Sequence, residues 1–178
     1  MTGALANAAF FQVGWWIAVL GAGRGYLWLS PLLVACLVWV NIRLSADPAS
    51  TIRIVLAVGL FGSLLDSVLA AAGVLQFVYS PFGSPWCPPW LIAIWCLFAT
   101  TLNGSLRWLA ERHKTSALIG GICGPFSYFA GHQFGALRLG ENERLSLLVL
   151  SLLWAILMPL LLRWAANGSA SVPIRGSS

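Results

Sequence analysis

Charged residues are scarce in this chain, and their scarcity excludes an ordinary water-soluble domain. Only 8% of its 178 residues are Asp, Glu, Lys or Arg, whereas 59% are hydrophobic. Soluble domains have about 25% charged and about 45–50% apolar residues. We therefore expect a protein that lies in a membrane.

Motifs that identify common enzymes and metal sites are also missing. The sequence has no GxSxG, HExxH or GxGxxG motif. Cys36, Cys87, Cys96 and Cys123 form no CxxC pair and have no ligand spacing with histidine, so we predict no metal site, disulfide framework or cofactor. The basic residues are spread singly along the chain, which argues against a nucleic-acid partner.

The chain does contain six apolar runs, each near the length of about 20 residues that crosses a bilayer. Backbone groups in hydrocarbon must be paired within the segment, so each run is predicted to be a helix. We expect an all-α polytopic membrane bundle of about six transmembrane helices, one domain over residues 1–168, and a short polar tail without fixed structure at 169–178. The predicted helices are Ala4–Gly21, Tyr26–Ile42, Ile52–Leu75, Trp90–Leu109, Ser116–Phe134 and Leu145–Ala165.

The basic residues predict the orientation of these spans. With six spans, one side would hold seven of the ten, namely Arg43, Arg53, Arg107, Arg112, Lys114, Arg163 and Arg175. The other side would hold Arg24, Arg138 and Arg144. Cytoplasmic loops carry the excess of Lys and Arg, so both termini are expected in the cytoplasm.

Tryptophans near the ends of the runs predict an aromatic belt at the membrane surface. The residues in question are Trp28, Trp86, Trp90, Trp108 and Trp164. The uncharged connection Gln76–Trp86 is predicted to lie on the outer membrane surface or to dip into it.

Asp66 is a carboxylate deep within the third run. Gly59, Ser63, Asp66 and Ala70 recur at helical spacing, so this stripe of small residues should face other helices. An ionisable group inside a membrane costs several kcal/mol unless it is paired, hydrated or protonated, which makes Asp66 a candidate site residue. The alternative is a structural Asp that is hydrogen-bonded to a neighbouring helix.

His132 is a possible partner for Asp66. Tyr128 and His132 fall near one face of the fifth run, and His132 lies toward the same outer half of the membrane as Asp66. An Asp–His pair in a cavity would act as a proton relay or a general acid/base unit. Asp66, His132 and Tyr128 are therefore candidate catalytic residues, although His132 also suits a plain interfacial role at a helix end.

A second polar group is predicted toward the cytoplasmic side. Thr100, Asn103 and Arg107 follow helical spacing in the fourth run, and Asn7 and Gln12 add amides from the first. These five are candidate substrate-binding residues. Arg107 equally suits snorkelling to lipid phosphates, and the amides equally suit hydrogen bonding between helices.

Three strings carry a family resemblance: FFQVGWWIAVLG at Phe10–Gly21, FATTLNGSLRWL at Phe98–Leu109 and GPFSYFAG at Gly124–Gly131. Together with the GLLxD-like stretch Gly62–Asp66, they make the chain similar to domain-of-unknown-function family 2878. The resemblance implies a small bacterial inner-membrane protein and no assigned reaction. The resemblance also implies a gene that is often encoded beside those of cyclopropane-fatty-acid-synthase-like proteins, which suggests a role in membrane-lipid modification.

Three functions stay open. The first is binding of, or action on, lipids or apolar molecules in the bilayer, with membrane lipids as partners. The second is a small-molecule transport or substrate-binding component that works with another membrane protein. The third is a structural or assembly role in which the polar residues only pack helices together. Whether the protein is an enzyme is left open.

Overall fold

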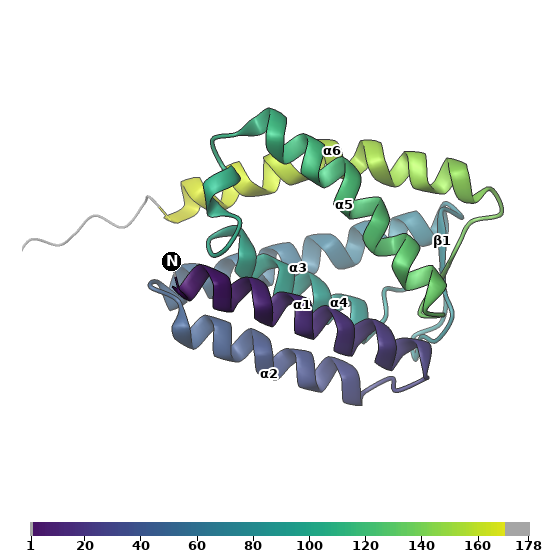
Figure 1. The fold of residues 1–178 in the computed structure, drawn as a ribbon. Helices are drawn as coiled ribbons and strands as arrows, with labels where there is room; N and C mark the ends of the chain where they lie inside the picture. The colour runs from purple at the N-terminus through teal and green to yellow at the C-terminus, as the bar shows by residue number, and fades with distance from the viewer. Residues whose placement is uncertain (1, 170–178) are drawn as a thin grey trace, which may run out of the picture.

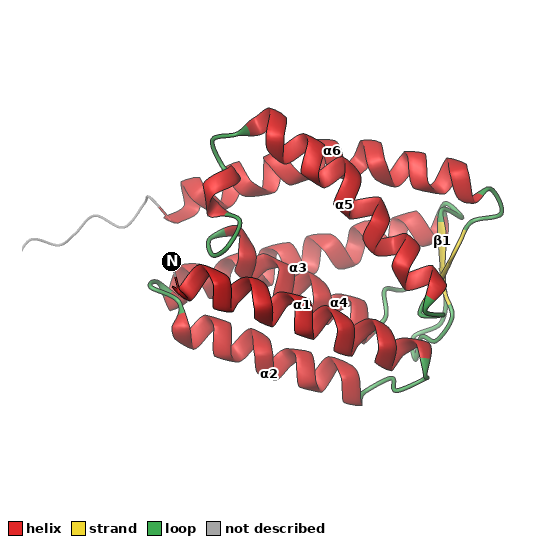
Figure 2. Ribbon diagram, viewed as in Figure 1, coloured by secondary structure: helices red, strands yellow, loops and turns green. Residues whose placement is uncertain are grey.

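The computed structural model describes residues 2–169, and these are mostly helical (Figures 1 and 2). Six α-helices follow one another: α1 Thr2–Gly23, α2 Leu29–Leu44, α3 Pro48–Ala71, α4 Pro89–Leu102, α5 His113–Gln133 and α6 Glu143–Ser169. A short 3-10 helix, η1 (Arg107–Leu109), precedes α5, and two short strands are β1 Leu75–Phe77 and β2 Leu137–Leu139. The predicted polar tail lies outside the described residues from position 170 onward.

Successive helices run back and forth along one axis, so the N-terminus and the end of α6 lie at the same end of the bundle (Figure 1). Within residues 2–169, three helices are long and apolar enough to cross a membrane, namely α1, α3 and α6. Helices α2 and α4 are apolar but shorter, while α5 has sufficient length and a less apolar composition. The 14 residues of α4 rise by about 21 Å, less than the hydrocarbon thickness of about 30 Å.

The outer surface of the bundle is apolar. On α3, for example, Leu56, Leu60, Leu64 and Val68 recur every four residues with more than half of their surface exposed. A large contiguous surface of this kind is avoided in water and is normal in contact with lipid. The apolar helices and this surface together indicate a membrane protein.

The helix boundaries differ from those expected by a few residues, and two of the differences have a local cause. Helix α3 begins at Pro48 because the Asp47 side chain caps it, accepting a hydrogen bond of 3.0 Å from the Ser50 backbone N–H. The fourth predicted helix is too long, since α4 ends at Leu102. Beyond that end, the backbone N–H of Ser105 donates to Asn7 Oδ1 at 3.0 Å instead of continuing the helical pattern.

The helices form two groups. Helix α4 packs against α1, α2 and α3, whereas α5 and α6 pair with each other and meet the first group mainly through α6. Helices α5 and α6 approach closely because Gly120 and Gly124 have no side chain. A Cβ at either position would overlap Trp154 of α6. These glycines therefore form a helix-packing surface.

A small antiparallel sheet joins the two groups at the end away from the N-terminus (Figure 2). Strand β1 pairs with β2 in the register Leu75↔Leu139, Gln76↔Arg138 and Phe77↔Leu137. These strands follow α3 and α5, so the pairing connects two segments that no sequence pattern places together.

Candidate functional site

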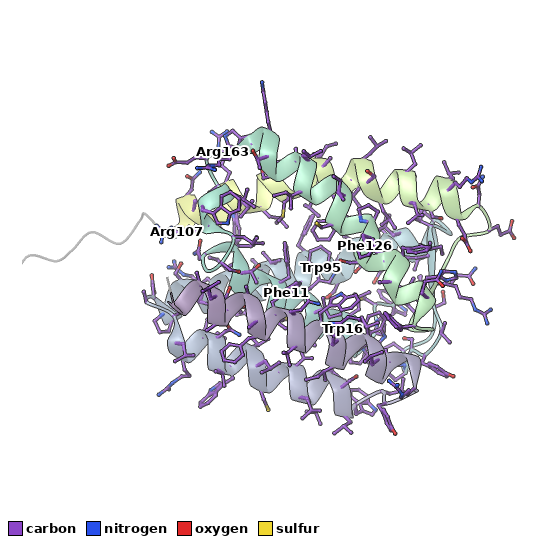
Figure 3. The ribbon with its side chains drawn as sticks, in the orientation of Figure 1. Phe11, Trp16, Trp95, Arg107, Phe126 and Arg163 are labelled. Atoms are coloured by element: carbon purple, nitrogen blue, oxygen red, sulfur yellow. The ribbon has the colours of Figure 1, made fainter. Side chains whose placement is uncertain are left out.

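A cavity of about 340 Å³ lies between α1 and α4 on one side and α5 and α6 on the other. Figure 3 shows Phe11 and Trp95 in this region of the bundle. The cavity contains no Lys, Arg, His, Asp or Glu in its lining, which is mainly apolar and aromatic. We call it the aromatic cavity, after the lining rings of Phe11, Trp15, Trp90, Trp95, Phe98, Tyr128 and Trp154.

Three of these rings connect the two helix groups. Trp95 of α4 stacks on Trp154 of α6, with 5.3 Å between ring centroids and 9° between ring planes. Phe98 meets both rings edge-on, at 5.9 Å from Trp95 and 5.6 Å from Trp154. Such aromatic pairs add about 0.5–1.5 kcal/mol each beyond area burial, so this side of the cavity is held firmly.

Asp66 lies behind this aromatic surface and is completely buried. Its Oδ2 accepts a hydrogen bond of 2.6 Å from the Trp95 indole N–H, and its Oδ1 accepts one of 2.6 Å from the Tyr128 hydroxyl. Gly62, one turn earlier on α3, has no Cβ, and one at that position would overlap the Trp95 ring. Asp66 therefore does not line the cavity but orients two residues that do.

The predicted contact between Asp66 and His132 does not form. His132 Nε2 lies 3.3 Å from Glu143 Oε1, while both oxygens of Asp66 are taken by Trp95 and Tyr128. The reason is the short β2 connection, which returns the chain from the end of α5 to Glu143 at the start of α6. Of the three candidate catalytic residues, the structure brings Asp66 and Tyr128 together and leaves His132 apart.

The aromatic cavity opens sideways. Four of its lining residues are exposed: Ala8 and Gln12 on α1, and Cys123 and Ser127 on α5. We call this gap between α1 and α5 the lateral opening. Exposed apolar residues such as Val13 and Ile122 lie beside it on the two helices, so we expect the opening to face the same medium as the exposed leucines of the bundle.

A second pocket, of about 550 Å³, lies where the beginnings of α1 and α3 meet the ends of α2 and α4. Four of the five candidate substrate-binding residues line it: Asn7, Thr100, Asn103 and Arg107. Gln12 is the exception, because it lines the aromatic cavity instead. We call this second site the polar pocket, and Arg107 is at the N-terminal end of the bundle in Figure 3.

Asn7 connects three helices beside the polar pocket. Its Nδ2 donates to Asn41 Oδ1 at 2.7 Å and to Thr100 Oγ1 at 3.3 Å. Its Oδ1 accepts from the Ser105 hydroxyl at 2.8 Å. The predicted alternative of hydrogen bonding between helices thus describes the observed contacts of Asn7, whereas Arg107 is exposed.

Comparison with protein families decides the membership of the chain. Residues 4–160 match the model of a family described as protein of unknown function (DUF2878). The chain belongs to this family. No curated protein and no solved structure matches it, so a function for this DUF2878 protein must be argued from its own residues.

Sequence reasoning missed the aromatic residues of the cavity in this DUF2878 chain. Trp90 was predicted to belong to the surface belt. That prediction is wrong, because only 1% of the surface of Trp90 is exposed. Trp28, Trp86, Trp108 and Trp164 are exposed, as the belt prediction requires. Trp95 and Trp154 lie inside apolar runs rather than at their ends, and this position could have indicated that they do not belong to the surface belt.

Proposed function

We propose that this DUF2878 member is a six-span inner-membrane protein that takes up a slender apolar molecule, such as an acyl chain, from the bilayer. The aromatic cavity holds the chain, and the lateral opening between α1 and α5 admits it. The observation that carries the proposal is a mainly apolar cavity with four exposed lining residues on α1 and α5, next to exposed apolar residues such as Val13 and Ile122.

The length and lining of the cavity suit an acyl chain. Its lining on α4 extends from Trp90 to Thr101, which is about 16 Å at roughly 1.5 Å per residue. A volume of about 340 Å³ with a mainly apolar lining suits an apolar molecule of moderate size, such as one acyl chain.

The proposed orientation places both termini in the cytoplasm. The helices alternate in direction, and Arg107 and Arg163 lie at the end that also holds the N-terminus (Figure 3). Arg43 lies over Trp39 at 5.5 Å and Arg112 over Trp108 at 5.3 Å, so cations and exposed rings occur together, as at a membrane surface.

Within this proposal, Asp66 is a positioning residue. Its carboxylate is sealed from the cavity, and its two hydrogen bonds set the orientation of Trp95 and Tyr128. Arg107, exposed beside the polar pocket, is placed to attract a lipid phosphate at the cytoplasmic surface.

A cavity-filling variant tests the proposal. Ser127→Trp puts a large ring into the lateral opening, and Leu118→Trp puts the same ring on an exposed position of α5 outside the cavity lining. We expect native mass spectrometry to detect apolar adducts on the wild-type protein and on Leu118→Trp, and to lose them on Ser127→Trp. Equal adducts on both variants would contradict the proposal.

A role in lipid modification requires a cellular measurement. We expect a deletion strain to show an altered membrane-lipid profile that wild-type protein restores and Ser127→Trp does not. An unchanged profile on deletion would leave binding as the activity and remove the link to lipid modification.

The polar pocket favours a second candidate, a small polar ligand delivered to or from another membrane protein. Its volume and its mixture of Asn7, Asn103 and Arg107 suit such a ligand. A polar metabolite retained by purified wild-type protein and lost in Arg107→Gln would support this candidate, and retention by both proteins would count against it.

A further inference from the structure

The indole of Trp90 has an unmet hydrogen-bonding requirement. Trp90 is the second residue of α4, lines the aromatic cavity and has only 1% of its surface exposed. Its Nε1 has no acceptor among residues 2–169. A buried donor without a partner costs about 1–3 kcal/mol, and tryptophan N–H groups are usually paired when buried.

Several other donors around the cavity are already engaged, although the Nε1 of Trp154, which also lines the cavity, likewise has no acceptor among residues 2–169. Trp95 and Tyr128 donate to Asp66, and the Ser127 hydroxyl donates to the Cys123 carbonyl at 2.9 Å. The Thr101 hydroxyl donates to the Phe98 carbonyl at 2.6 Å. Trp90 therefore offers a donor that the protein's own groups do not use.

Trp90 lies at one end of the aromatic cavity. Trp90 at the start of α4, Val19 near the end of α1 and Leu137 of β2 all line the cavity at the end that carries the β1–β2 pair. Leu106 and Met158 line the opposite end of the cavity. A ligand that accepts a hydrogen bond from Trp90 would thus have its polar atom at the end near the β1–β2 pair and its apolar body toward Leu106 and Met158.

The absence of charged residues from the lining limits which polar group of a ligand could accept the hydrogen bond from Trp90. No Lys, Arg or His lines the cavity, and an unpaired carboxylate in an apolar site is strongly disfavoured. An uncharged carbonyl oxygen accepts a hydrogen bond without this cost.

We propose that the ligand of the aromatic cavity is an uncharged acyl ester whose carbonyl oxygen accepts a hydrogen bond from Trp90 Nε1. This inference rests on the proposed binding of an acyl chain and adds the chemical class. The acyl chain extends from Trp90 toward Leu106, and the ester is either a monoacyl molecule or one chain of a membrane lipid.

The test compares ligands that differ in the acceptor. Purified protein in detergent micelles is loaded with radiolabelled methyl dodecanoate, which is displaced with methyl dodecanoate, with pentadecane, an alkane of equal heavy-atom number, or with dodecanoate. Wild-type protein should need about three to ten times more pentadecane than ester for half-displacement, as one hydrogen bond implies. Ionised dodecanoate should also compete less well than the ester.

Trp90→Phe removes the N–H and keeps an aromatic ring. We expect this variant to lose the preference for the ester over the alkane, while Trp86→Phe, at an exposed tryptophan outside the cavity lining, keeps it. If Trp90→Phe does not fold, the indole signals of wild-type protein labelled with nitrogen-15 tryptophan replace it. The ester should then shift one buried indole N–H signal that pentadecane leaves in place.

The outcomes separate this inference from the function on which it rests. Equal displacement by ester and alkane would overturn the acyl-ester inference, including the case in which water satisfies Trp90, and would leave apolar binding intact. Failure of methyl dodecanoate to bind at all would overturn both. A phosphatidylethanolamine added as a further competitor tells the two ester sources apart, since only the membrane-lipid source predicts that it displaces the methyl ester.

Discussion

The indole N–H of Trp95 donates a hydrogen bond of 2.6 Å to the carboxylate of Asp66, across the contact between α4 and α3. The same ring stacks on Trp154 of α6. One tryptophan thus connects a buried acid, the aromatic cavity and the second helix group. Changes at Asp66 are therefore expected to affect the cavity although the carboxylate does not line it.

Replacing Asp66 by Ala should destabilise the protein by about 1–3 kcal/mol, because the buried donors of Trp95 and Tyr128 lose their acceptors. Asp66→Asn keeps one acceptor oxygen and should cost less. Chemical unfolding in detergent micelles measures both, with Leu56→Ala on the exposed face of α3 as the control. In parallel, Asp66→Asn should weaken binding of methyl dodecanoate. An Asp66→Ala protein as stable as wild type would refute the positioning role.

Adding a methyl group at Gly62 should disturb the same contact. Gly62→Ala places a Cβ against the Trp95 ring, and overpacking of this kind costs about 1–3 kcal/mol. Gly3→Ala is the matched control, since a Cβ at this helical glycine of α1 meets open space and should be neutral or slightly stabilising. Thermal unfolding followed by tryptophan fluorescence compares the two. Equal melting temperatures would show that the ring is not held against α3.

Asn7 should contribute to stability through its partners on two other helices. Asn7→Ala removes the acceptor for Ser105 and the donor to Asn41, and we expect a loss of about 1–2 kcal/mol. A double-mutant cycle with Asn41→Ala should give a coupling energy of about 0.5 kcal/mol or more. Strict additivity of the two substitutions would mean that their contact contributes nothing.

The orientation of the chain can be measured with reporter fusions. A fluorescent protein fused after Ala165 should fluoresce, and alkaline phosphatase fused at the same point should be inactive, because the basic end of the bundle is expected in the cytoplasm. A phosphatase fused at Phe82 should be active. The reverse pattern would contradict the proposed topology.

Much of the fold was predictable because a segment that crosses the bilayer must be apolar and helical, and both requirements follow from the amino-acid composition of the segment. Runs of about 20 apolar residues predict helices, whereas the start of α3 at Pro48, four residues before the predicted Ile52, depends on the cap by Asp47. The end of α4 was not predictable. It depends on a hydrogen bond from Ser105 to Asn7, a residue about a hundred positions earlier in the chain.

The candidate site was predictable only in part, for the same reason. Helical spacing singled out Asp66 and Tyr128, but it did not indicate which of Tyr128 and His132 meets the carboxylate. That choice depends on how α5 packs against α3 and on the β2 turn that brings Glu143 to His132.

By itself, the sequence determined that this chain is an apolar helical protein of the DUF2878 family with an acid buried in its third helix. Tertiary structure alone decided the partners of that acid, the burial of Trp90 and the presence of a cavity open between α1 and α5. The physical reason is range: propensity and hydropathy act along one segment, whereas a cavity is defined by side chains from four helices that meet only after the bundle has packed.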